Sequence, residues 1–131
     1  MIDIEVRGEA APEPRLFVTL TNQSREDLVT YEHSLPWRSA YAMMVVAVET
    51  DPAGTPLERT LPVDDPGPGT VTVKPGETLH GEIPLAPRFP SLSGALAKRD
   101  VLAFWAYRFQ PVGKQPLPWV AGHVVLERVT A

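Results

Sequence analysis

Apolar and polar residues alternate along much of this chain, with the period of two that a half-buried β-strand produces. The clearest case is residues 71–85, VTVKPGETLHGEIPL, where apolar runs flank the KPGE segment at 74–77. Proline presets φ at the second position of a turn, and glycine accepts the positive φ that a type II turn needs at the third. Residues 71–85 therefore predict a β-hairpin.

Several other segments show short strand patterns separated by turn-forming residues. We predict strands at residues 2–7, 16–21, 28–33, 101–109 and 119–129, and a weak edge strand at 57–62. The strand at 101–109, VLAFWAYRF, is apolar on both faces, so we place it in the middle of a sheet with Trp105 in the core.

Residues 40–50, AYAMMVVAVET, form the most apolar run, and its alanines and methionines are compatible with a helix. The β-branched Val45, Val46 and Val48, followed by the DPAG turn signal at 51–54, favour a central strand over residues 43–48 instead.

Fifteen prolines and nine glycines lie between the apolar runs rather than in one block, so we interpret them as boundaries of strands. Residues 93–98, SGALAK, are compatible with one or two helical turns. About eight or nine strands at roughly ten-residue spacing are typical of an antiparallel β-sandwich. The predicted fold is all-β, with at most one short helix and a single domain over residues 1–131.

The order of the motifs resembles a known pattern. An L-x-V-x-L-T-N-x-S strand at 16–24 precedes an apolar strand with a D-x-x-G turn at 43–54, then V-x-V-x-P-G-E-x-L-x-G-x-I-x-L at 71–85, and the aromatic strand at 101–109. This order is similar to that of immunoglobulin-like domains of bacterial proteins, namely the intracellular proteinase inhibitors and the N-terminal domains of some metallopeptidases. The resemblance implies an immunoglobulin-like sandwich; its motifs are turn and core residues, so no family binding residue is carried over.

Composition narrows the class of protein. The chain has no cysteine, which excludes disulfides, thiolate zinc sites and thiol nucleophiles. A net charge of −4 argues against non-specific binding to nucleic acid. No apolar run is long enough to span a bilayer, and residues 1–10 lack the features of a signal peptide. We expect a cytoplasmic protein that contacts neither membrane nor nucleic acid.

No residue pattern indicates catalysis or a cofactor. His33, His80 and His123 lack the close spacing of metal ligands, and we expect them on the solvent side of strands. The Asp64–Asp65 pair lacks the calcium-loop pattern, and no G-x-S-x-G motif is present. We therefore expect a protein that is not an enzyme and has no metal or other cofactor.

Loops of a sandwich whose consecutive strands are antiparallel alternate between its two ends. Loops 8–14, 34–40, 63–70 and 86–100 would then share one end, and 22–27, 51–56, 74–77 and 110–118 the other. The first end combines aromatic and charged side chains and is the predicted partner-binding site, formed by Trp37, Arg38, Asp64, Asp65, Arg88 and Phe89. The alternative is that Trp37 and Phe89 only plug the end of the sandwich.

The sequence thus favours a non-enzymatic protein-binding module that contacts another protein, such as a protease inhibitor or an immunity-type inhibitor of a toxin enzyme. One alternative is a structural or assembly subunit that pairs through a sheet edge. A carbohydrate-binding module or an enzyme would need a cleft with convergent polar groups, which no sequence pattern indicates.

Overall fold

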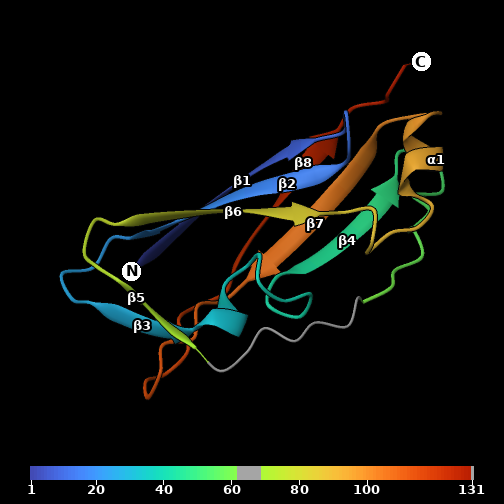
Figure 1. Ribbon diagram of the computed structural model, residues 1–131. Helices are drawn as coiled ribbons and strands as arrows, with labels where there is room; N and C mark the ends of the chain where they lie inside the picture. The colour runs from blue at the N-terminus through green and yellow to red at the C-terminus, as the bar shows by residue number, and fades with distance from the viewer. Residues whose placement is uncertain (62–68, 131) are drawn as a thin grey trace.

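The computed structural model describes residues 1–61 and 69–130. Over these residues the chain forms eight β-strands, a short α-helix α1 (Leu92–Leu96) and a 3-10 turn η1 (Glu32–Ser34) (Figure 1). The strands are β1 (Ile2–Glu9), β2 (Arg15–Asn22), β3 (Leu28–Tyr31), β4 (Met44–Glu49), β5 (Thr70–Val73), β6 (Thr78–Pro84), β7 (Val101–Tyr107) and β8 (Val120–Leu126). The all-β prediction is confirmed, and residues 44–49 form a strand rather than a helix.

The described residues build three antiparallel sheets, in the orders β1-β2-β6, β4-β7-β8 and β3-β5. The two three-stranded sheets face each other across one core, which is visible as two layers in Figure 1. Alternate residues of β2 enter this core from one side and alternate residues of β4 and β7 from the other, among them Leu16, Val18, Leu20, Val45, Ala47, Val101, Ala103 and Trp105.

The predicted hairpin at 71–85 is wrong, although its turn is correct. Gly76 has φ of +78°, and the Glu77 N–H donates to the Lys74 carbonyl at 2.9 Å. However, β5 pairs with β3 and β6 pairs with β2, so the turn carries the chain from one sheet to another.

Asn22 explains why β5 and β6 separate. Its backbone N–H donates to the Glu77 carbonyl at 3.0 Å, and its own carbonyl accepts from the Gly76 N–H at 2.7 Å. Its side-chain Nδ2, which is fully buried, donates to the Val73 carbonyl at 2.8 Å. The end of β2 thus lies between the two strands and takes hydrogen bonds that would otherwise join them.

Two further local predictions differ from the structure. No strand forms over the described residues 57–61; Pro56 makes an isolated bridge to Val48, because proline offers no donor to continue a ladder. Residue 62 lies outside the described part of the chain. His33 lies in η1 rather than in a strand, since β3 ends at Tyr31.

The predicted division of loops between two ends holds only in part. Loops 8–14 and 86–100 do meet, because the Leu85 N–H donates to the Pro14 carbonyl at 3.0 Å. Loop 51–56 lies beside residues 86–100 rather than opposite them, since Arg99 contacts Asp51 at 3.7 Å. The alternation fails at residues 32–43, which connect β3 to β4. β4 is antiparallel to β7, and Thr30 of β3 forms an antiparallel bridge with Pro111, just after β7. Both strands therefore run opposite to this part of the chain, so β3 and β4 run in the same direction.

Candidate protein-binding surfaces

The loop end predicted from sequence is only partly a surface. Trp37, Arg38 and Arg88 line one hollow of about 190 Å³. Phe89 is 1% exposed and belongs to the core, rather than lying on the surface where we expected it. Its backbone N–H donates to the Leu85 carbonyl at 2.9 Å in the turn that leads to α1. Asp64 and Asp65 lie outside the described residues.

The side chains around this hollow act mainly in packing. A Cβ at Gly81 would lie 2.0 Å from the Trp37 ring, so the indole fills the space that this glycine leaves on β6. Arg88 is 6% exposed and donates to the Met43 carbonyl at 3.2 Å, which fixes its loop to the start of β4. Arg38 is exposed and pairs with Glu32 at 3.2 Å. The arrangement favours the alternative in which Trp37 plugs the molecule.

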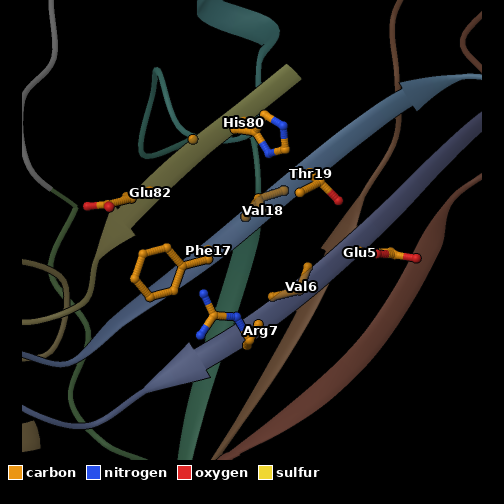
Figure 2. A pocket seen from close by; sticks show the side chains of 9 residues that line it. Glu5, Val6, Arg7, Phe17, Val18, Thr19, His80 and Glu82 are labelled. Atoms are coloured by element: carbon orange, nitrogen blue, oxygen red, sulfur yellow. The ribbon is translucent and has the colours of Figure 1, made fainter. Parts of the chain in front are cut away.

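The outer face of the β1-β2-β6 sheet carries a broad, open hollow of about 800 Å³ (Figure 2). Its aromatic ring is Phe17, which lies beside Arg7 in Figure 2 and is flanked by the Arg7 and Arg15 guanidiniums at 4.5 and 5.8 Å from its centroid. Arg15 also pairs with Glu82 at 3.3 Å. Because these charges remain hydrated and cover the ring, this face resembles an ordinary solvated sheet surface.

The outer face of the β4-β7-β8 sheet is different in character. The strand register places nine outward side chains in three rows: Met44, Ala106 and Ala121; Val46, Phe104 and His123; Val48, Leu102 and Val125. Eight of the nine are apolar, and we call this set the apolar face. Met44, Val46, Phe104 and Val125 are 54, 39, 44 and 48% exposed. The Phe104 ring lies beside His123, with 6.0 Å between ring centroids.

Opposite charges lie at the two ends of the apolar face. At one end Arg108 stacks on Trp119, with its guanidinium 5.2 Å from the ring. At the other end Asp100 follows the last apolar row and accepts a hydrogen bond from the Arg128 N–H at 2.7 Å. Glu127, on the neighbouring strand extension, is exposed. The face is therefore bounded by a cation at one end and by carboxylates at the other.

Sequence reasoning missed the apolar face although the signal was present. Residues 43–48 and 101–106 are both apolar on two sides, and these runs pair as β4 and β7. Two neighbouring strands of this kind need cover on both faces of their sheet. The described residues supply that cover on the inner side, from the β1-β2-β6 sheet, while the outer side stays exposed.

The pKa values of Asp51 and Tyr107 are shifted from their ordinary values, and the structure explains both shifts. Hydrogen bonds from the Thr55 hydroxyl and N–H, together with the Arg99 charge, lower the pKa of Asp51. Burial raises the pKa of Tyr107, whose hydroxyl donates to the Ser34 carbonyl at 2.5 Å. Both groups hold loops in place, and neither lines the hollow of Figure 2.

Within residues 1–61 and 69–130, no cluster of three or more histidine, aspartate or glutamate side chains could hold a metal ion. The same residues include no helix with the length and apolar character needed to cross a membrane. No protein-family model matches this chain, and no curated protein is significantly similar to it. The likeness to bacterial immunoglobulin-like domains rests on the sequence motifs alone.

Proposed function

We propose that this chain is a non-enzymatic protein-binding module and that the apolar face is its contact surface. The observation that carries the proposal is the joint exposure of Met44, Val46, Phe104 and Val125 on one sheet face. Contiguous exposed apolar surface of this kind marks interaction sites in soluble proteins. Removing it from water on binding is favourable, at roughly 25 cal/mol per Å².

The composition of the face supports protein as the ligand. Phe, Met and Arg are enriched in protein interfaces. Phe104 lies at the centre of the apolar face, Met44 lies at one corner, and Arg108 lies at one end. The outer face of a three-stranded sheet is an open surface, whereas sites for small molecules are usually concave and enclose most of the ligand. The outer face of the other sheet is a weaker candidate, because its Phe17 ring and its Glu82 carboxylate already pair with Arg7 and Arg15.

The specific role that fits best is that of an inhibitor, either of a protease or of a toxin enzyme. Support comes from the resemblance of residues 16–24 and 71–85 to bacterial immunoglobulin-like inhibitor domains, and from two facing sheets of the kind an immunoglobulin-like sandwich contains. A chain without cysteine needs no oxidising compartment, which suits action in the cytoplasm.

An assembly role through a sheet edge is less well supported at β4, an edge strand of its sheet. Residues 55–57 already run along this edge: the Glu49 N–H donates to the Thr55 carbonyl at 2.8 Å, and the Leu57 N–H donates to the Ala47 carbonyl at 2.9 Å. If the chain assembles, the face of this sheet is a better contact than this edge.

The proposal is tested with two matched variants on exposed positions of edge strands. Val125→Glu places a charge on the apolar face, and His80→Glu places the same charge on the outer face of the other sheet. After chemical cross-linking in producing cells, the wild type and His80→Glu should give the same protein adducts, and Val125→Glu should lose them. Adducts that persist unchanged in Val125→Glu would refute the apolar face as the contact surface.

A further inference from the structure

We propose that the apolar face binds a second copy of this chain, packed face to face with its strands antiparallel to those of the first. This inference rests on the proposed function and names the partner. It begins from the two charged ends of the face, Arg108 at one end and Asp100 with Glu127 at the other.

Symmetry limits how two identical faces can meet. A twofold axis that relates them must lie in the plane between them, because it exchanges the two sides of that plane. An axis along the strands places Arg108 against Arg108 and carboxylates against carboxylates. An axis across the strands reverses one copy and places Arg108 of each copy against the carboxylates of the other. Opposite charges attract across an interface and like charges repel, so the second arrangement is favoured.

The strand register identifies where this axis passes. Asp100 and Arg108 flank the two ends of β7, four residues on either side of Phe104. Phe104 pairs with Val46 and His123 in the central row. When Arg108 of one copy meets Asp100 of the other, each residue of the central row meets its own counterpart. Phe104 then contacts Phe104 at the centre of the interface, surrounded by Met44, Val48, Leu102 and Val125.

The size of the face predicts the strength of the dimer. Three strands about 4.8 Å apart, over the eight residue steps from 100 to 108 at about 3.3 Å each, give a flat area on the order of 400 Å² per copy. Stable complexes bury about 800 Å² of accessible surface per partner. Since the accessible area of side chains exceeds the flat area, we expect a reversible dimer at the weaker end of specific association.

The first experiment measures the mass of the purified chain by sedimentation over a wide range of protein concentration. The wild type should shift from monomer to dimer as concentration rises. Phe104→Glu should raise the dissociation constant by roughly 30-fold or more, because it places two carboxylates together at the centre of the contact. His80→Glu should dissociate like the wild type. Val125→Glu, on the edge strand β8, leaves Phe104 intact and should also raise the dissociation constant of the dimer.

The second experiment tests the orientation and uses the absence of cysteine in the chain. His123→Cys lies on the predicted axis, so a short bis-maleimide should join two copies of this variant. Val125→Cys should not cross-link to itself but should cross-link when mixed with Ala121→Cys, because the reversed strands bring 125 opposite 121. Cross-linking of Val125→Cys to itself in preference to Ala121→Cys would overturn the antiparallel arrangement.

The outcomes separate this inference from the proposed function. A wild type that stays monomeric at every concentration overturns the second copy as partner. The apolar face then remains the contact surface only if cellular adducts to a different protein are lost in Val125→Glu. A dimer that Phe104→Glu and Val125→Glu leave unchanged also overturns the inference, because it must form through another surface.

Discussion

Trp105 packs closely against the neighbouring strand β8, as Gly122 on that strand shows. A Cβ at position 122 would lie 2.8 Å from the indole Cζ2, so a glycine on β8 allows the ring to lie in the core. Trp105→Ala should lower the free energy of unfolding by about 3–5 kcal/mol, the usual range for deleting a large buried aromatic side chain. Urea denaturation measures this difference, and an unchanged midpoint would contradict the packing described.

Trp37 shows the same relation at the opposite sheet, where Gly81 leaves space for the indole. The ring is half-buried, so Trp37→Ala should lower the free energy of unfolding by about 2–4 kcal/mol, about 1 kcal/mol less than deleting a fully buried tryptophan. Arg38→Ala is the matched control at an exposed neighbour and should change it by less than about 1 kcal/mol. Equal effects for both variants would show that Trp37 is not a plug.

Asp51 links one loop to the stability of the protein in acid. Its pKa is lowered by the Thr55 hydrogen bonds and by Arg99, so the stabilisation that it contributes is fully present above the unfolded-state pKa of about 3.9. This contribution decreases as pH falls through the lowered folded-state pKa. Asp51→Asn should therefore be less stable than the wild type at neutral pH, and the difference should shrink below about pH 4. Thermal unfolding across this pH range provides the test; a difference that stays constant would exclude the linkage.

At the scale of single elements, the period of two located most strands because each half-buried strand carries its own pattern. The partners of those strands were harder to predict. Residues 71–85 contain a correct turn, yet the hairpin is wrong because a buried side chain from β2, Asn22, binds the Val73 carbonyl. The pattern of residues 71–85 contains no information about this hydrogen bond, because its donor lies more than fifty positions earlier in the sequence.

Asn22 is consequently the residue on which the division between sheets depends. Its Nδ2 donates to the Val73 and Glu26 carbonyls, and its Oδ1 accepts from the Ser24 N–H and hydroxyl. Asn22→Ala would leave these buried and half-buried groups without partners, at a cost of about 3 kcal/mol or more. Equilibrium denaturation measures the loss, and Gln23→Ala, at the exposed next position, is its control. A loss below about 1 kcal/mol would show that water replaces the side chain without difficulty.

At the scale of the whole molecule, we predict both apolar strands, at 43–48 and at 101–109, to be central. β7 is central, between β4 and β8, but the prediction for 43–48 is wrong because β4 lies at the edge of the same sheet. An apolar pattern on both sides of a strand indicates that both faces of the sheet are buried. It does not indicate whether the residues that bury them belong to the same chain or to a partner. For this reason the candidate site could not be predicted by looking for loops rich in tryptophan and arginine. Phe89 and Arg88 satisfied that search and are buried, whereas Phe104 lies on a strand rather than in a loop and is 44% exposed.

The two charged ends of the apolar face provide the final prediction, because they determine how two copies are oriented. Arg108→Glu should raise the dimer dissociation constant about tenfold, since each reversed charge then meets carboxylates of the other copy in two equivalent places. Arg7→Glu, a charge reversal on the outer face of the other sheet, is the control and should change it little. Adding Glu127→Arg to Arg108→Glu should restore association to within about threefold of the wild type, because the exchanged charges again face opposite partners. Sedimentation at low ionic strength measures all four proteins. If the double variant is weaker than Arg108→Glu alone, the two ends do not meet and the axis across the strands is excluded.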